Sequence, residues 1–467
     1  MTPLATTATS SPAKLQRTLG LWHIIIIGLA YIQPMTVLDT FGMVSEASVQ
    51  HVPTSYIIAL IAVLLTSLSY GAMIRRYPSS GSAYTYAQKS IHPNVGFMVG
   101  WSSWLDYLLS PLVNIILAVI YLEALFPNIN AWVWVIGLTA FMTGINILGS
   151  KIVAYFNSWI VLVQLIVIGV FTWLIYSKLS VGINADGTIN PEGYQLWSLA
   201  PFWTEIASMG ALITGATILC FSFTGFDSLS SLAEETKDVS KTLPKAIFLT
   251  ALIAGIVFII STYFMQIYFP KTPDTYFPDI DGTQPDILLL VGGSAFQAGV
   301  LGFAIVTVMA SGISAHAGVS RLMYVMGRDG VINKKIFGHI SPRFFTPTYN
   351  ILIAGAVALT AGFTDLDTIV HLISFGALTA FSFVNLSVIA RYVIRDKQYN
   401  TPKDILMYLI IPALGFISVV AMWISADLIA IQMGLGWAAI GLVYLIYLTR
   451  GFKQLPPQYK HDEKHMN

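Results

Sequence analysis

The chain has 467 residues, of which 55% are hydrophobic and only 10% are charged, and its formal net charge is +1. Since soluble proteins carry roughly 25% charged residues and nucleic-acid binders need a basic field, these figures exclude a soluble enzyme, a disordered chain and a DNA- or RNA-binding protein. One cysteine, Cys220, excludes an intramolecular disulfide and a cysteine-rich metal site, which leaves an all-α integral membrane protein.

The N-terminal segment 1–20 is polar and has no small-residue cleavage site before a short apolar core, so we interpret it as a cytoplasmic tail and not as a signal peptide. Twelve segments follow that can each cross a bilayer, at about 20 residues per crossing. They cover 21–43, 54–74, 95–124, 131–149, 154–177, 209–233, 245–269, 294–320, 348–363, 367–390, 405–425 and 428–449. A second polar tail, 450–467, follows the last span.

The basic residues predict the orientation of these spans. With the N-terminus in the cytoplasm and alternating spans, all but two of the 24 lysines and arginines face the cytoplasm, the exceptions being Lys178 and Lys271. The positive-inside rule therefore places both termini in the cytoplasm. The outer loops are acidic, which is either the simple consequence of excluding bases or a weak funnel for cations.

Two spans contain a break in the helix. The first reads GLAYIQPMTVLDTFG, where Pro34 disfavours helix at Gln33. The sixth reads CFSFTGFDSLSSLAEET, where Gly225 can support an unwound stretch. Broken helices in equivalent halves of a chain point to a transporter's binding site; an ordinary proline kink with a small-residue packing face is the alternative.

Away from the ends of the predicted spans, three carboxylates remain, namely Asp39, Asp106 and Asp227, and no lysine or arginine does. An intramembrane carboxylate costs about 2.5–3.5 kcal/mol and normally faces a cavity, takes a partner or carries a proton. The missing positive charge is then the substrate, a proton or a metal cation. A protonated or helix-capping carboxyl with a structural hydrogen bond is the alternative for each acid.

Four further stretches carry a family resemblance. They are RRYPSSGSAYTYAQKS at 75–90, VGFMVGWSSWLDYLLSP at 95–111, GFDSLSSLAEETKDVSKTLPKAI at 225–247 and SRLMYVMGRDGVINKKIFGHISPRFFTP at 320–347. They resemble the amino acid–polyamine–organocation transporter superfamily, and most of all its bacterial proton-driven putrescine importers. The resemblance extends from about residue 17 to residue 450.

The resemblance implies twelve transmembrane helices in a five-plus-five inverted repeat with broken helices 1 and 6. The repeats would be 21–178 and 209–390, and two added helices would occupy 405–449. It implies import of the diamine putrescine by proton symport across a bacterial inner membrane, without a cofactor. Helices 1 and 6 would carry the site, and helices 3, 8 and 10 would complete it.

The residues at the helix-1 break favour a diamine over an amino acid. Tyr31-Ile32-Gln33-Pro34 stands where amino-acid permeases of this superfamily have a glycine-rich break whose amides bind a carboxylate. A diamine instead needs anions near its ends and an apolar or aromatic wall. The expected substrate-binding residues are Tyr31, Gln33, Asp39, Trp101, Asp106, Tyr107, Phe223, Phe226 and Asp227.

The sequence also predicts which residues carry the coupling proton and which form a gate. Where proton-coupled relatives often have a helix-5 lysine, this chain has Gln164, so one of Asp39, Asp106 and Asp227 is expected to carry the proton. His316 and His371 are weaker candidates. The charged residues Arg75, Arg76, Glu234, Glu235, Arg321 and Arg328 either pair as an inner gate or serve only as topology signals.

The expected partners are a small diamine, protons and membrane lipid, with no nucleic acid and no metal site; the oligomeric state stays open. An amino-acid importer, or a putrescine/ornithine exchanger on the same fold, is the alternative function. An intramembrane enzyme finds no support, because the sequence has neither a GxSxG turn nor an HExxH pair.

Overall fold

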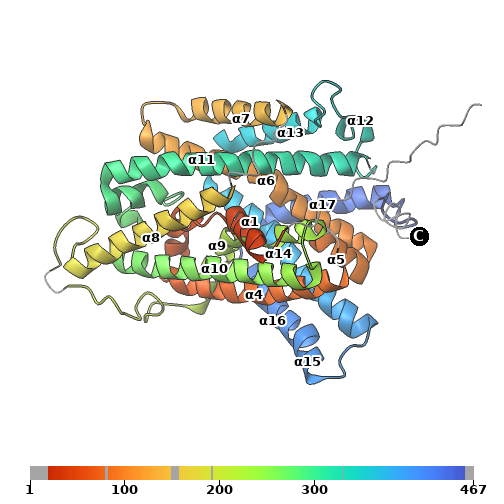
Figure 1. Ribbon diagram of the computed structural model, residues 1–467, viewed down its shortest axis with the longest axis horizontal. Coiled ribbons are helices and arrows are strands. Elements are labelled where there is room, and N and C mark those ends of the chain that lie inside the picture. Colours follow the sequence, from red (N-terminus) through yellow and green to blue (C-terminus); the bar gives the residue numbers. More distant parts are fainter. Residues whose placement is uncertain (1–18, 79–81, 149–156, 191–192, 329, 458–467) are drawn as a thin grey trace, which may run out of the picture.

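The computed structural model describes residues 19–78, 82–148, 157–190, 193–328 and 330–457. Within these ranges the regular structure is helical, and extended pairing is limited to two isolated bridges. Most of the long helices run side by side along the long axis of the molecule (Figure 1). The prediction of an all-α fold is confirmed. The predicted tails fall largely outside the described residues.

The first half of the chain begins with a helix in three pieces. Its elements are α1 (Leu21–Ile32), α2 (Thr36–Asp39), α3 (Phe41–Ala47), α4 (Val52–Arg76), α5 (Ala83–Ser90), α6 (Pro93–Leu125), α7 (Ala131–Leu148) and α8 (Asn157–Val181). The short α5 lies between the second and third predicted spans.

The second half repeats the pattern of a broken helix followed by long ones. Its elements are α9 (Met209–Phe223), η2 (Asp227–Glu234), α10 (Val239–Tyr268), η3 (Pro273–Thr275), α11 (Gln284–Arg328), α12 (Lys334–Phe337), α13 (Thr348–Ala358), η4 (Leu359–Gly362), α14 (Leu366–Val388) and η5 (Ile389–Arg395). The chain ends with α15 (Pro402–Ile405), η6 (Leu406–Ile410), α16 (Ile411–Ile424) and α17 (Leu428–Leu448).

The predicted spans agree with these helices. In the described part of the chain, 11 helices are long and apolar enough to cross a membrane. The remaining predicted span, 348–363, corresponds to the shorter apolar helix Thr348–Gly362. Each of the twelve predicted segments therefore has its helix.

Both predicted breaks are present. Helix 1 stops at Ile32, and Gln33 adopts a left-handed conformation with φ of 51° before Pro34. Helix 6 stops at Phe223, and Gly225 has φ of 104°. The backbone at Gly225 approaches helix 1 so closely that an added Cβ would lie 2.7 Å from Cβ of Tyr31. The two breaks therefore lie against each other.

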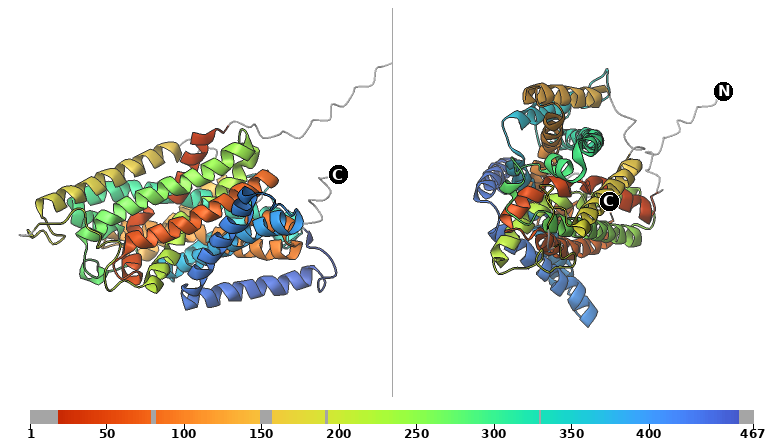
Figure 2. Two further views of the ribbon diagram at one scale, coloured as in Figure 1. Left: turned by 90° about the horizontal axis from the view of Figure 1, so that it is seen from below. Right: turned by 90° about the vertical axis from the view of Figure 1, so that its left-hand side faces the viewer.

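Helices in equivalent places of the two halves pack together. The second predicted span, α4, lies along the seventh, α10, and the third, α6, lies along the eighth, α11. The last two helices, α16 and α17, lie at the outside of the bundle (Figure 2). The division into two five-helix repeats and two added helices stays a prediction.

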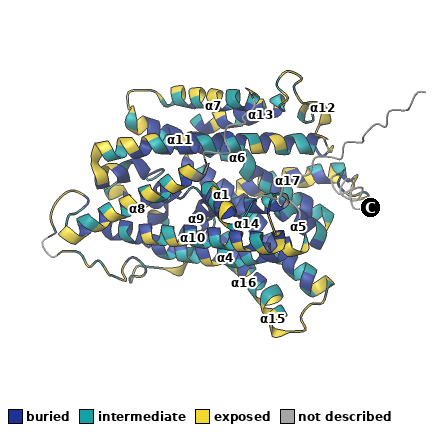
Figure 3. Cartoon of the chain, in the orientation of Figure 1, coloured by how far each residue is buried: buried dark blue, intermediate teal, exposed yellow. Residues whose placement is uncertain are grey.

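The burial pattern separates a packed interior from an apolar exterior. Buried residues concentrate around α1, α9 and α14, whereas exposed residues are prominent on α7, α8 and α15 (Figure 3). Large apolar side chains such as Trp159, Ile417 and Val443 are exposed on α8, α16 and α17. Such a surface suits contact with lipid and not with water.

Candidate functional site

A cavity of about 670 Å³ lies where the two broken helices meet. Its wall comes from the helix-1 break, from α6, from the helix-6 break and from α11, with one residue each from α8 and α14. These are helices 1, 3, 6 and 8, with 5 and 10, so the helices implied by the resemblance do surround a cavity. Its size is within the range of small-molecule sites.

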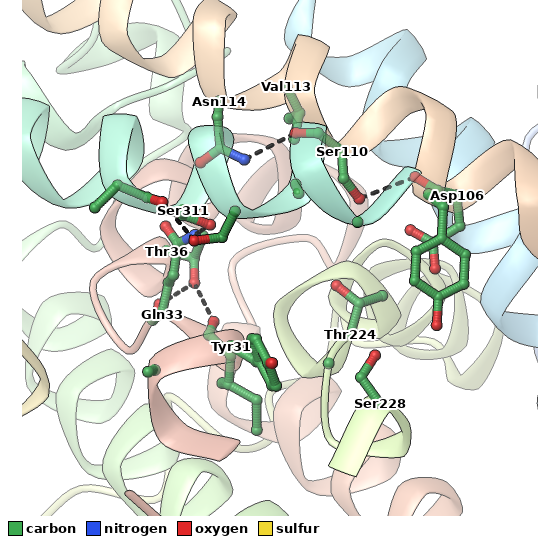
Figure 4. Close-up of a pocket in the computed structure, with 18 of the residues that line it drawn as sticks. Tyr31, Gln33, Thr36, Asp106, Ser110, Val113, Asn114, Thr224, Ser228 and Ser311 are labelled. Carbon is green, nitrogen blue, oxygen red and sulfur yellow. Dashed lines mark hydrogen bonds between the residues drawn. The ribbon is translucent and has the colours of Figure 1, made fainter. Parts of the chain in front are cut away.

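One wall of the cavity is a polar row along α6. Asp106, Ser110 and Asn114 follow one another at one-turn intervals, with Asp106 and Asn114 at opposite ends (Figure 4). Ser110 Oγ donates to the carbonyl of Asp106 at 2.9 Å, and Asn114 Nδ2 donates to the carbonyl of Ser110 at 2.8 Å. Asn114 Oδ1 is buried and has no hydrogen-bond partner. The row thus offers a carboxylate at one end and an unused acceptor at the other.

The opposite wall is formed by the two breaks. Tyr31, Thr224 and Ser228 lie across the cavity from the α6 row (Figure 4). Gln33 Nε2 donates to Ser311 Oγ of α11. This contact fixes the helix-1 break to helix 8 through side chains that line the cavity themselves.

Gln164 of α8 holds the same break from behind. Its Oε1 accepts a hydrogen bond of 3.4 Å from the backbone N–H of Met35, immediately after Pro34. The Gln164 side chain is fully buried, and its Nε2 has no partner. The neutral side chain of Gln164 therefore binds helix 1 directly after its break.

Asp106 is the intramembrane acid on the cavity wall. Asp227 opens η2 and accepts hydrogen bonds from the backbone of Gly225 and Ser228, both of which do line the cavity. The charges of Asp106 and Asp227 are close enough to interact. Two carboxyl groups are therefore concentrated at one end of the cavity, one on the wall and one just behind it.

Asp39 lies apart from that cavity. Its side chain is only 1% exposed, and both carboxyl oxygens lie 2.9 Å from the hydroxyl of Tyr121 on α6. The adjacent backbone is bound to the segment before α11, because Thr283 Oγ1 donates to the carbonyl of Leu38 at 2.8 Å and Thr283 N donates to that of Asp39 at 3.3 Å. This end of the bundle is sealed around Asp39.

Two of the five aromatic residues predicted at the site line the cavity, namely Tyr31 and Tyr107. Trp101 instead stacks on Trp437 of α17, with ring centroids 5.1 Å apart, and donates Nε1 to its carbonyl at 3.0 Å. Its position in the sequence beside Asp106 did not reveal that it faces the opposite side of α6.

The two phenylalanines of helix 6 are also outside the cavity. Phe223 is fully buried with its ring against Tyr56, and Phe226 is fully buried between Tyr70 and Phe381. Conversely, sequence reasoning missed Ser110 and Asn114 on the wall. Their spacing of four and eight residues from Asp106 was the available signal, because residues one turn apart share a helix face.

The predicted gate residues are spread over the end of the bundle that carries Arg321, itself an exposed residue on the cavity wall. Arg76 pairs with Asp396 at 3.5 Å, and Arg391 pairs with the same carboxylate at 3.2 Å. Arg75 Nε donates to the carbonyl of Gly71 in its own helix at 3.1 Å.

The acidic half of the predicted gate lies beside the N-terminal segment. The carbonyl of Glu235 accepts a 3.0 Å hydrogen bond from the N–H of Leu19. Arg328 is the last residue of α11. The side chain of Glu234 lies outside the described part of the chain. The gate thus stays a prediction.

Both histidine candidates have partners. His316 Nε2 lies 2.8 Å from the carbonyl of Ile351, so this buried histidine forms a hydrogen bond to the backbone of a neighbouring helix. His371 Nε2 lies 3.4 Å from a carboxyl oxygen of Asp367. Neither lines the cavity described above.

Acidic residues gather near the sealed end. Burial, and then the negative charges of Asp367, Asp279 and Asp365, raise the pKa of Asp281 to about 6. Asp281 precedes Thr283 by two residues, so this group stands beside the contacts that close the bundle over Asp39. A concentration of negative charge at a mouth attracts cations.

Gly225→Ala should reduce the transport that the family resemblance implies at least about tenfold, because a side chain at this left-handed position is strained and its Cβ would lie 2.7 Å from Cβ of Tyr31. Initial uptake rates normalised to the amount of membrane-inserted protein measure the effect. Gly302→Ala in α11 is the control, since no atom lies within 4 Å of its added Cβ. Equal rates for the two variants would contradict the importance of the contact between the breaks.

Comparison with known proteins gives consistent matches over the whole bundle. A family profile described as "Amino acid permease" matches residues 13–447. The chain is 53% identical over 455 residues to the low-affinity putrescine importer PlaP of Escherichia coli (strain K12), covering 97% of this chain and 98% of that protein. It is 26% identical over 476 residues to the branched-chain amino acid permease BcaP of Bacillus subtilis (strain 168), covering 96% of each.

Proposed function

The chain belongs to the amino acid permease family, as its motifs predicted, and we propose that it imports putrescine by proton symport. Its relatives are named as transporters and permeases, so the protein is a transporter and not an enzyme. The observation that carries the choice of substrate is the position of Asp106. A carboxylate on the wall of a cavity between two broken helices suits an ammonium group, which it can bind by a charge-assisted hydrogen bond.

The remaining cavity residues suit an aliphatic cation. Tyr31 and Tyr107 can place ring faces beside an ammonium group, for about 0.5–2 kcal/mol each. Val113, Leu117 and Ile373 supply apolar surface for methylenes. Asp227, just behind the wall, adds to the negative potential without having to touch the substrate.

We place the protein in a bacterial cytoplasmic membrane with both termini in the cytoplasm. The distribution of lysine and arginine supports this orientation. The cavity extends along α11 from Thr307 to the exposed Arg321, whereas the end around Thr283 is sealed. In this orientation the described conformation is inward-facing.

We assign the coupling proton to Asp39. Its carboxyl group does not line the substrate cavity, so a proton there and a diamine at Asp106 occupy separate places. Tyr121 bridges the two carboxyl oxygens without bringing a positive charge. When the contacts of Thr283 open, Asp39 would meet the outer solution and bind a proton there.

The proposal is tested by uptake of radiolabelled putrescine into proteoliposomes. An imposed pH gradient, acid outside, should drive accumulation, and a sodium gradient alone should not. Excess putrescine or cadaverine should compete, and excess leucine should not. Accumulation that follows sodium and ignores pH would contradict proton symport.

The related exchange reaction is distinguished in the same system. Vesicles preloaded with ornithine should take up putrescine no faster than unloaded vesicles if the protein is a symporter. Strong stimulation by internal ornithine would establish an exchanger and remove the symport assignment.

A further inference from the structure

We propose that α6 selects the diamine by its length. Asp106 binds one ammonium group, and Asn114 Oδ1 accepts a hydrogen bond from the other. This inference rests on the proposed function and adds to it a second end of the substrate site, where the cavity wall carries a neutral acceptor in place of a second acid.

The spacing of the two residues fits a four-carbon diamine. Asn114 follows Asp106 by eight residues, which is a rise of about 12 Å along the helix. An extended butane-1,4-diamine measures about 6 Å between its nitrogens by ordinary bond geometry. A charge-assisted hydrogen bond of about 2.8 Å at each end brings the required span to the same 12 Å or so.

The surroundings of Asn114 hold its side chain in place and leave its Oδ1 as an acceptor without a partner. Its Nδ2 already donates to the carbonyl of Ser110, whereas its Oδ1 is buried and has no hydrogen-bond partner. The residue is only 5% exposed. A Cβ added at Gly312 of α11 would lie 3.1 Å from Cβ of Asn114, so the neighbouring helix restricts the side chain. A buried acceptor without a donor gains most from a ligand that brings one.

The same geometry argues against amino acids as cargo. A long amino acid that places its ammonium group at Asp106 and spans the same distance would bring its carboxylate to Asn114 Oδ1. Both are acceptors, and two acceptors cannot share a hydrogen bond. Selection then comes from unfavourable contacts with the wrong ligand as well as favourable ones with the right ligand.

Competition by amines of different length tests the proposal. Propane-, butane-, pentane- and hexane-diamine, with butylamine, are compared as inhibitors of radiolabelled putrescine uptake. The ratios of their inhibition constants do not depend on how much protein folds. Wild type should prefer the four-carbon diamine and bind butylamine at least about tenfold more weakly.

Two substitutions at one position give opposite expectations. Asn114→Leu has similar volume and no acceptor, so the preference for butanediamine over butylamine should fall to within about threefold. Asn114→Gln extends the acceptor into the cavity by one methylene and should shift the preference toward propanediamine. Ser418→Ala in α16 is the control, because Ser418 bonds its own helix at the carbonyl of Leu414 and lies away from the cavity; it should leave the ratios unchanged.

Failure of this inference is distinct from failure of the proposed function. If Asn114→Leu and Asn114→Gln keep the wild-type ratios, Asn114 does not bind the second amine, whereas putrescine import stands. If the wild-type protein takes up no diamine, the proposed function itself is wrong and the selection by length with it.

Discussion

Asp106→Asn should lower putrescine uptake at least about thirtyfold at substrate concentrations below KM. The substitution keeps the size of the side chain and removes the charge that faces the cavity. Truncating one partner of a buried charge pair costs about 2–5 kcal/mol, and every 1.4 kcal/mol is about tenfold in affinity. The loss should appear mainly as weaker competition by putrescine, because a neutral amide cannot form the charge-assisted hydrogen bond to an ammonium group.

Glu123→Gln is the matched control for that experiment. Glu123 lies on the same helix, α6, and its substitution removes the same charge, but its side chain is exposed and away from the cavity. It should leave uptake within about twofold of wild type, as surface substitutions usually have small effects. If Asp106→Asn bound putrescine with wild-type affinity, Asp106 would not be the residue that binds the ammonium group.

Asp39→Asn should separate putrescine movement from the pH gradient. A gradient of one pH unit supplies about 1.4 kcal/mol per proton, enough for about tenfold accumulation. Without a titrating group at residue 39, the internal concentration should rise only to the external one, while exchange of labelled putrescine across the membrane continues. The measurement is the accumulation ratio in proteoliposomes with and without an imposed pH gradient, with the membrane potential clamped.

Tyr121→Phe refines the assignment of Asp39. It keeps the ring and removes the hydroxyl that lies 2.9 Å from both carboxyl oxygens. Accumulation should persist, with its dependence on external pH displaced from that of wild type, because a hydrogen bond to a carboxyl group influences its titration. Tenfold accumulation by Asp39→Asn would show that the proton is carried elsewhere, with Asp106 and Asp227 as the remaining candidates.

The membrane class, the spans and the two breaks could be predicted from sequence because they depend on local properties. A bilayer requires about 20 apolar residues per crossing, and Pro34 and Gly225 alter the backbone wherever they occur in a helix. The structure accordingly places a helix at every predicted segment, including Thr348–Gly362. The family motifs also predicted which helices surround the site, which hydropathy alone does not.

The composition of the site was predicted less well, because it depends on how each helix is rotated about its axis. Trp101 and Asp106 are five residues apart on α6, yet one packs against Trp437 and the other lines the cavity. Phe223 and Phe226 turn into the protein interior beside a break that does face the cavity. Sequence proximity to a functional residue did not identify the exposed face.

By itself, the sequence determined that three acids lie among apolar spans without an intramembrane base, which points to a positively charged cargo or coupling ion. Only the tertiary structure distinguished these acids: Asp106 on the cavity wall, Asp227 behind it among backbone amides, and Asp39 sealed against Tyr121. Burial in a membrane is set by the apolar residues near an acid in the chain, whereas access to a cavity is set by residues far away in sequence that pack around it.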